Sequence, residues 1–154
     1  MRLLLLALAL ACAGAPHAAA QVSPSSGPVR SESRAQSFDA FWPAFRAAVL
    51  SGDVDAVAGM TRFPLEVKGE LDRDPVRLVT RSELPRLLER ALAADSGLSL
   101  REPLTNRRLV ERTEPPVQPA RGVAVSPDAA RIAAFVFGRT NAGWRLQRVY
   151  LPDD

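Results

Sequence analysis

Apolar residues recur every three or four positions in some stretches of the chain and every second position in others. The first stretch with helical spacing opens at Ser37, whose hydroxyl suits an N-cap. Its apolar face is largely aromatic and comprises Phe38, Phe41, Trp42, Phe45 and Val49. Pro43 lies inside this stripe without an N–H for the helix, so we predict a kink or a separate first turn. Gly52 ends this helix, and Asp53 caps a short second one.

A period of two runs from Phe63 to Leu71 and predicts a half-buried strand. Its inward positions are Phe63, Leu65, Val67 and Leu71. The sequence from Asp72 to Pro75 is typical of a turn, after which residues 76–79 return as a short strand. Residues 80–83 match a capping box and begin an amphipathic helix, which ends at Asp95-Ser96-Gly97.

Residues 98–116 allow two interpretations. Leu104 and Leu109 bracket Thr105 in the pattern of a hydrophobic staple around a cap. This pattern favours a short helix from Asn106 to Arg112, and a strand is the alternative.

The last third of the chain predicts three strands, from Ala120 to Val125, from Arg131 to Arg139 and from Trp144 to Leu151. The second of these is apolar on both faces, as expected for a central strand. In the third, Trp144, Leu146 and Tyr150 share one parity, so we expect them on the same face. The order of elements predicts an α+β fold, with N-terminal helices packed on the concave face of an antiparallel sheet.

The first twenty residues have the pattern of a signal peptide. Arg2 provides a short basic start, and the apolar run from Leu3 to Ala11 is too short to cross a bilayer. Ala18-Ala19-Ala20 supplies the small residues that precede a cleavage site, so we expect cleavage before Gln21. Cys12 allows an alternative, cleavage before it with a lipid on its sulfur. Either way we expect a periplasmic or secreted protein without a membrane span.

Two further segments follow the predicted signal peptide. Residues 21–36 are rich in Ser, Pro, Gly, Gln and Arg and contain few apolar residues, which is typical of a disordered linker. Residues 37–152 have enough apolar residues for one compact core, and we expect a single domain there.

The reactive residue types are scarce, and this excludes several chemistries. Cys12 is the only cysteine and His17 the only histidine, and both precede the expected cleavage site. The mature chain would therefore lack a thiolate nucleophile, an imidazole base and the usual zinc or copper ligands. We predict no catalytic Ser-His-Asp or Cys-His arrangement, no metal site and no cofactor.

The charge pattern predicts no nucleic-acid interface. The formal net charge is +3, and Lys68 is the only basic residue besides the arginines. Acidic and basic residues alternate along the chain, and the densest basic group, Arg107, Arg108 and Arg112, fits the solvated face of a helix. Frequent Ala, Arg and Pro with a single Lys suggest a GC-rich bacterial coding sequence.

The order of elements resembles the NTF2-like (cystatin-like cone) superfamily over about Ser37 to Leu151. The resemblance rests on the helix ending at Ser51-Gly52-Asp53 with Val54-Asp55-Ala56-Val57 after it, and on the Gly143-Trp144-Arg145-Leu146 strand. Phe38-x-x-Phe41-Trp42 and Arg62-Phe63-Pro64-Leu65-Glu66-Val67 are also similar to a group of small secreted bacterial proteins of unknown function. The resemblance implies helices packed into a strongly curved sheet, and it leaves the activity open.

Enzymes of that superfamily place an acid or base inside the cone beside a Tyr or His. Here Tyr150 is the only tyrosine, and the acidic residues fall in caps, turns or polar faces. We therefore assign no catalytic residue. The leading hypothesis is a non-catalytic module that binds an apolar small molecule or a periplasmic protein. Its expected pocket-lining residues are Trp42, Phe45, Arg62, Phe63, Phe135, Trp144 and Tyr150.

Three alternatives to this hypothesis stay open. The aromatic residues of the set would form the core in any case, because aromatics at helical or strand spacing are usually core. An enzyme that transfers a proton or dehydrates a substrate would need a carboxylate buried in the cone near Tyr150. A homodimer through the open face of the sheet is the third alternative.

Overall fold

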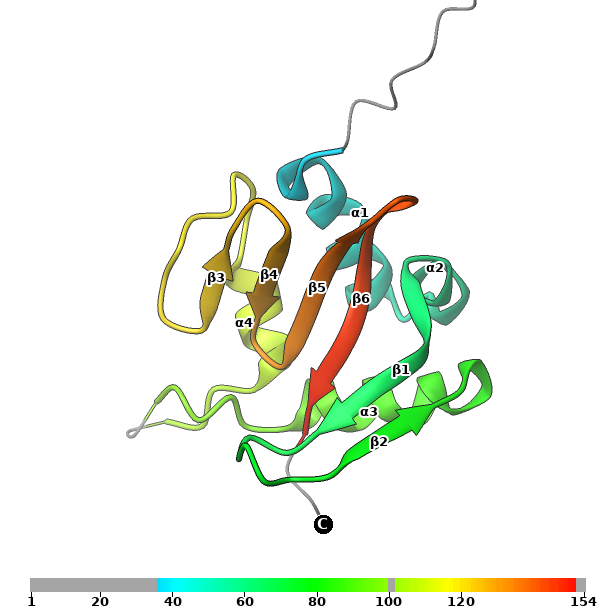
Figure 1. The fold of residues 1–154 in the computed structure, drawn as a ribbon. Helices are drawn as coiled ribbons and strands as arrows, with labels where there is room; N and C mark the ends of the chain where they lie inside the picture. The colour runs from blue at the N-terminus through cyan, green and yellow to red at the C-terminus, as the bar shows by residue number, and fades with distance from the viewer. Residues whose placement is uncertain (1–35, 100–101, 152–154) are drawn as a thin grey trace, which may run out of the picture. The chain divides into compact units, whose positions relative to one another are not determined.

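The computed structural model describes residues 36–99 and 102–151 of the chain (Figure 1). The predicted signal peptide, with Cys12, and residues 21–35 of the predicted linker lie outside the described residues. The helices are α1 (Phe38–Ser51), α2 (Val54–Gly59), the 3₁₀ turn η1 (Arg81–Glu83), α3 (Leu84–Ala93) and α4 (Asn106–Arg112). The strands are β1 (Thr61–Lys68), β2 (Val76–Val79), β3 (Val123–Val125), β4 (Ala129–Ile132), β5 (Phe135–Thr140) and β6 (Gly143–Tyr150).

The six strands form one open sheet in the order β2-β1-β6-β5-β4-β3, and the helices lie on one of its faces (Figure 1). This confirms the α+β fold class. The predicted antiparallel pairing holds for every neighbouring pair except one, because β1 runs parallel to β6 with Val67 opposite Val149. The sheet is therefore mixed. Because β1 pairs with β6, the last strand in the sequence lies inside the sheet, between β1 and β5.

Helix α1 forms as its sequence predicts. The Ser37 hydroxyl accepts a hydrogen bond from the Ala40 N–H at 3.2 Å, and Gly52 closes the helix with a φ of 75°. The helix runs through Pro43 without interruption, so the predicted separate first turn is wrong. Pro43 is exposed and costs the helix one main-chain hydrogen bond on its solvent side.

The aromatic face of α1 fills the space against β5 and β6. Phe45 and Phe137 meet edge to face at 4.8 Å between ring centroids, and Phe38 lies 5.0 Å from Trp144. The rings in this cluster belong to Phe38, Phe41, Trp42, Phe45, Phe135, Phe137 and Trp144, all buried. The cone is therefore closed by side chains, and burial of this cluster is the main source of stability.

Strand β1 begins two residues earlier and ends three residues earlier than predicted. Leu65 and Val67 are buried as expected, but Leu71 is 53% exposed. It lies in a turn, where its N–H donates to Asp74 Oδ2 at 2.7 Å. The predicted inward position of Leu71 is wrong, because the carboxylate of Asp74 provides a turn cap that ends the alternation.

The predicted central strand from Arg131 to Arg139 is two strands, β4 and β5, joined at Ala133-Ala134. Ala133 has a φ of 55° and is the only non-glycine residue in the described ranges with a positive φ. No Gly, Pro, Asn or Asp occurs at this turn. The continuous apolar sequence therefore predicts one strand where the structure has two.

A bulge in β6 changes the predicted faces of the last strand. Phe137 pairs with Leu146, whereas the adjacent Val136 pairs with Arg148, so β6 contains one extra residue. After the bulge Val149 points into the core and Tyr150 points to the other face. The predicted shared face of Trp144, Leu146 and Tyr150 is therefore wrong for Tyr150.

The remaining helices agree with the sequence. Residues 98–116 contain the favoured short helix, α4, with the Thr105 hydroxyl accepting from the Arg108 N–H at 3.3 Å. The capping box before α3 is present, with Glu83 Oε2 accepting from the Thr80 N–H at 2.8 Å. The Thr105 hydroxyl and the Glu83 carboxylate thus fix the starts of α4 and of the helical segment before α3.

Candidate functional site

A hollow of about 640 Å³ lies where the connection that follows α3, the start of α4 and one end of the sheet meet. We call it the Tyr150 hollow; its lining includes Ser96, Leu98, Asn106, Val123, Ala134 and Tyr150. These residues come from distant parts of the chain. The reversed parity after the β6 bulge directs Tyr150 here instead of into the core.

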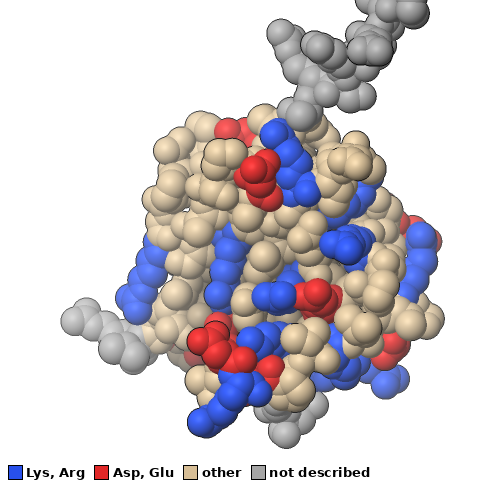
Figure 2. Space-filling model, in the orientation of Figure 1, with Lys and Arg blue, Asp and Glu red and all other residues tan. Residues whose placement is uncertain are grey.

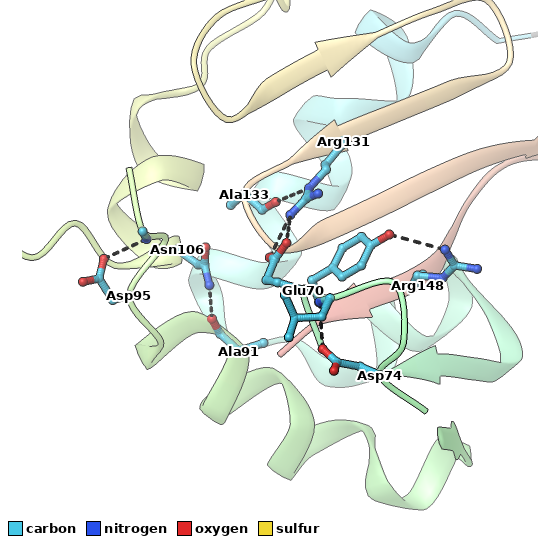
Figure 3. Close-up of polar contacts among 11 residues, drawn as sticks. Glu70, Asp74, Ala91, Asp95, Asn106, Arg131, Ala133 and Arg148 are labelled. Carbon is cyan, nitrogen blue, oxygen red and sulfur yellow. Dashed lines mark hydrogen bonds and ion pairs between the residues drawn. The ribbon is translucent and has the colours of Figure 1, made fainter. Parts of the chain in front are cut away.

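One wall of the Tyr150 hollow is a cation stacked on an aromatic ring (Figure 3). The Arg131 guanidinium carbon lies 4.3 Å from the centre of the Tyr150 ring. Arg131 Nη2 donates to both carboxylate oxygens of Glu70, at 2.9 and 3.1 Å, and its Nε donates to the Ala133 main-chain oxygen at 3.2 Å. These three contacts hold the guanidinium over the ring, although the ion pair itself is partly exposed.

A second arginine holds the Tyr150 hydroxyl. Arg148 Nη1 donates to the Tyr150 oxygen at 3.4 Å, while its Nε and Nη2 donate to Glu66 Oε2 at 2.8 and 2.6 Å. The hydrogen bonds to Tyr150 and then to Glu66 raise the pKa of Arg148, so it stays charged. The ring of Tyr150 is thereby anchored at its hydroxyl and covered on one face.

The opposite wall is built by the connection between α3 and α4. Asn106 is 3% exposed, and its Nδ2 donates to the Ala91 main-chain oxygen at 2.9 Å (Figure 3). The Ser96 N–H donates to the Leu104 oxygen at 2.8 Å, which fixes the backbone of the connection. Ser96 Oγ is buried and has no hydrogen-bond partner among the described residues.

The turn at Ala133-Ala134 is a strained part of the rim. A left-handed conformation costs an alanine about 1–2 kcal/mol, and both residues are buried and line the hollow. The Arg131 Nε bond to the Ala133 oxygen is one contact that holds this turn. Strain of this size is retained where the surrounding structure needs a particular backbone path.

The predicted pocket-lining residues do not gather in one place. Trp42, Phe45, Phe135 and Trp144 are each at most 1% exposed and belong to the core cluster, while Phe63 is half-buried against that cluster. Arg62 is exposed beside a shallow hollow of about 600 Å³, which Arg145 and Asn141 also line. Tyr150 alone of the seven lines the Tyr150 hollow.

Sequence reasoning missed Ser96, Asn106, Glu70 and Arg131 as members of this site. Ser96 belongs to a helix-ending signal, and Glu70 and Arg131 are polar positions within predicted strands. The sequence separation of 61 residues between Glu70 and Arg131 leaves no local signal for their contact. Only the topology, with β1 inserted beside β6, brings them together.

The carboxylates of the described residues are neither buried nor gathered into a ligand cluster. Every described Asp and Glu is at least partly exposed, so none meets the requirement for a buried acid beside Tyr150. Within residues 36–99 and 102–151, no three His, Cys, Asp or Glu side chains cluster as metal ligands would. None of the described helices is both long enough and apolar enough to span a bilayer.

The surface charges are mixed. Figure 2 shows basic and acidic side chains close together on the sheet side, separated by uncharged surface. The ion pairs of the described residues include Arg148 with Glu66 and Arg131 with Glu70. Paired charges of this kind do not form the continuous basic surface that tracks a phosphate backbone.

No protein-family model matches the chain, and no curated protein matches it. Among solved structures, the chain is similar to an NTF2-like protein with a cystatin-like fold from Novosphingobium aromaticivorans, with 19% sequence identity and a TM-score of 0.32. The match covers 70% of this chain and 74% of that one. The observed architecture, helices on one face of an open sheet, agrees with the fold that the sequence resemblance implied.

Proposed function

We propose that this chain is a non-catalytic binding module of the periplasm or of the secreted fraction, and that it holds a small molecule in the Tyr150 hollow. The observation that carries the proposal is the hollow itself, about 640 Å³ in volume, in which the Tyr150 ring is held by Arg131 and Arg148.

The size and lining of the hollow support a small ligand. Its volume of about 640 Å³ falls within the usual range for ligand sites, roughly 300–1,000 Å³. Leu98, Val123 and Ala134 supply apolar contact, while Tyr150 and Arg131 supply a few polar groups. A molecule with an apolar body and one or two hydrogen-bonding groups suits this lining.

The charges around the hollow favour a neutral ligand over an anion. Glu70 and Asp95 carry two negative charges, and Arg131 is the only cation among the described lining residues. Glu70 already pairs with Arg131, and Asp95 Oδ1 accepts from the Gly97 N–H at 3.0 Å. A carboxylate ligand would therefore meet no unpaired cation in this lining, and we expect sterols and aromatic alcohols to bind more tightly than the corresponding acids.

The lack of a suitably placed acid favours binding over catalysis. Proton transfer needs a group whose pKa is tuned by burial, and the described carboxylates are all in contact with solvent. The cone, where the related enzymes place that group, is occupied here by Trp42, Phe45 and Phe137. The Tyr150 hydroxyl accepts from an arginine, an arrangement that holds the ring in place.

A thermal-shift screen tests the proposal. Neutral sterols, aromatic alcohols and fatty alcohols are screened beside their carboxylic acids against the wild-type chain. Ala120→Trp would place a large side chain at the exposed rim of the hollow without touching its main-chain bonds to Val123. We expect neutral compounds to raise Tm, and we expect this shift to disappear in Ala120→Trp.

Ala47→Trp is the matched control, because Ala47 is exposed on α1 and does not line the hollow. It should respond to ligands like the wild type. Shifts that persist in Ala120→Trp would place the ligand elsewhere, and a screen in which no compound raises Tm above assay noise would refute small-molecule binding.

A further inference from the structure

Arg62 is the only charged residue among the predicted pocket-lining residues, and it does not line the Tyr150 hollow. It lines instead the shallow hollow of about 600 Å³, which we call the Arg62 hollow. The lining comes from the first two residues of β1, the end of β5, the β5–β6 turn and the first half of β6. Figure 1 shows these segments at one end of the sheet. No lining residue is shared with the Tyr150 hollow, so this is a separate place on the molecule.

The described lining of the Arg62 hollow is basic. It contains the three arginines Arg62, Arg139 and Arg145, and no Asp or Glu. Arg139 is already engaged, because its Nη1 lies 3.9 Å from Asp128 Oδ1 and its Nη2 donates to the Gln36 main-chain oxygen at 3.4 Å. The positive charge available to a ligand is therefore that of the other two arginines.

Arg62 and Arg145 form no ion pair with the described residues. Arg145 Nη1 donates to the Trp144 main-chain oxygen at 2.7 Å, which anchors one side of its guanidinium group. Its remaining N–H groups and those of the exposed Arg62 are free for other acceptors. Two charged, planar donor groups thus border the same hollow.

The strand register places these two arginines on the same face of the sheet. Thr61 of β1 lies opposite Leu146 of β6, and both side chains are buried on the helix side. Arg62 and Arg145, one position away on each strand, therefore face the other side. Like charges on neighbouring strands repel, and an anion held between them removes that repulsion.

An amide lies beside the two guanidinium groups. Gly138 of β5 is opposite Arg145, and the space that a side chain would fill at Gly138 is taken by the amide of Gln147. Gln147 also lines the Arg62 hollow, and its Nε2 is a neutral donor. The hollow therefore combines two cations with a side chain that can donate without adding charge.

From the two guanidinium groups without an ion pair, the amide beside them and the lack of a carboxylate in the described lining, we infer that the Arg62 hollow binds the phosphate group of a phosphomonoester. Such a group carries about two negative charges at pH 7, which match the two arginines, whereas a carboxylate carries one. Its several oxygens accept from donors on different sides, and arginine is suited to bind two of them at once. The group belongs to a soluble phosphate ester or to a lipid headgroup.

A two-dimensional amide NMR titration of the wild-type chain with glycerol 3-phosphate tests this inference. Glycerol and acetate are the control ligands, at equal ionic strength. We expect glycerol 3-phosphate to shift the amide signals of Arg62, Asn141 and Gln147, because these residues line the Arg62 hollow. The signals of Ser96 and Ala134, in the Tyr150 hollow, should stay in place. Glycerol should have no effect, and acetate should bind about tenfold more weakly or less.

Three variants test the assignment of the side chains. Arg62→Gln and Arg145→Gln should each weaken glycerol 3-phosphate binding about tenfold or more, because each removes a charged donor. Gln147→Glu should abolish binding, since it places a carboxylate of nearly the same size in the hollow. The amide spectra themselves establish that every variant is folded.

Arg121→Gln is the matched control for net charge. Arg121 is exposed just before β3 and does not line the Arg62 hollow. The variant loses the same single positive charge as Arg62→Gln, and it should bind glycerol 3-phosphate like the wild type.

Cosedimentation with phosphatidylcholine vesicles, with and without phosphatidic acid, distinguishes the two sources of the phosphate group. Sedimentation that requires phosphatidic acid and is lost in Arg62→Gln assigns the group to a lipid headgroup. Binding of glycerol 3-phosphate without sedimentation assigns it to a soluble ester.

The inference is overturned if acetate shifts the same amides as strongly as glycerol 3-phosphate, because the site would then not select a phosphate. It is overturned as well if Arg121→Gln weakens binding as much as Arg62→Gln, since the effect would come from net charge alone. Unchanged amide signals at Arg62, Asn141 and Gln147, together with no sedimentation on phosphatidic acid, would also refute it.

Discussion

The indole Nε1 of Trp42 donates to the main-chain oxygen of Thr113 at 2.8 Å, joining α1 to the residue that follows α4. Arg46, one turn further along α1, donates to the oxygens of Val110 and Glu111 at 3.1 and 2.6 Å. The Val110 oxygen also accepts from the Thr113 N–H at 3.3 Å, and the side chains of Trp42 and Arg46 supply further donors to the carbonyls at this helix end. The aromatic face of α1 thus both fills the cone and satisfies the end of another helix.

The two buried tryptophans predict a contrast in stability. Trp144 is as buried as Trp42, yet its Nε1 has no partner among the described residues. Trp42→Phe should cost about 3 kcal/mol, because it removes ring volume and leaves the Thr113 oxygen unpaired. Trp144→Phe should cost only about 1–2 kcal/mol, since the lost N–H was unsatisfied. Urea unfolding of both variants measures this, and equal costs would contradict it.

The turn between β4 and β5 predicts that a glycine is tolerated at one of two adjacent alanines. Ala133→Gly should stabilise the fold by up to about 1 kcal/mol, because glycine adopts a φ of 55° without steric cost. Ala134→Gly is the control and should destabilise by about 1 kcal/mol, since Ala134 is buried and has no positive φ. Thermal and urea unfolding give both values. If Ala133→Gly is the more damaging of the two, the turn is not strained.

Glu83 predicts a pH dependence of stability. Hydrogen bonds from the Thr80 N–H and hydroxyl lower the pKa of Glu83 below its usual value. Stabilisation by this carboxylate is therefore complete above the unfolded-state pKa, about 4.3, and is lost as the pH falls through the lower folded-state pKa. The stability difference between wild type and Glu83→Gln should be constant near neutral pH and shrink in acid.

Urea midpoints over a series of pH values measure this difference. Glu89→Gln is the matched control, because Glu89 is exposed on α3, which directly follows Glu83, and makes no side-chain hydrogen bond or ion pair with the described residues. Its difference from wild type should be small at each pH. A Glu83→Gln difference that grows below about pH 4 would contradict the capping role.

The helices could be predicted from the sequence because their signals are local. Ser37, Asp53 and Thr105 each accept from a backbone N–H three residues later, as an N-cap does, and Gly52 adopts the left-handed conformation that ends α1. The apolar faces of α1 and α3 then followed from their spacing. A capping residue together with an apolar face at helical spacing leaves a short segment few alternatives to a helix.

The sheet could be predicted only in part, because its errors depend on non-local contacts. The parallel pairing of β1 with β6 depends on how distant segments assemble. The turn at Ala133-Ala134 contains none of the residues that usually indicate a turn. The bulge near Arg148 reversed the face of Tyr150, since one extra residue flips every later side chain. The site residues were missed for the same reason, because the bulge and that turn together shape the Tyr150 hollow.

The pattern of residues 1–20 predicts the mass of the exported chain. When the protein is produced in a bacterial host, intact mass measurement of the periplasmic fraction should show a chain that begins at Gln21. A chain that begins at Cys12 with an attached lipid would support the alternative anchoring. A chain that retains residues 1–20 and stays in the cytoplasm would contradict the proposed compartment.

The most direct test of the proposed function is a two-dimensional NMR titration of the wild-type chain with a neutral compound from the screen. We expect the amide signals of Ser96, Ala134 and Tyr150 to shift, because they line the hollow. The indole signals of Trp42 and Trp144 should stay in place, since the core is closed around them. Shifted indole signals with unchanged amides at Ser96, Ala134 and Tyr150 would place the ligand inside the cone and contradict this account.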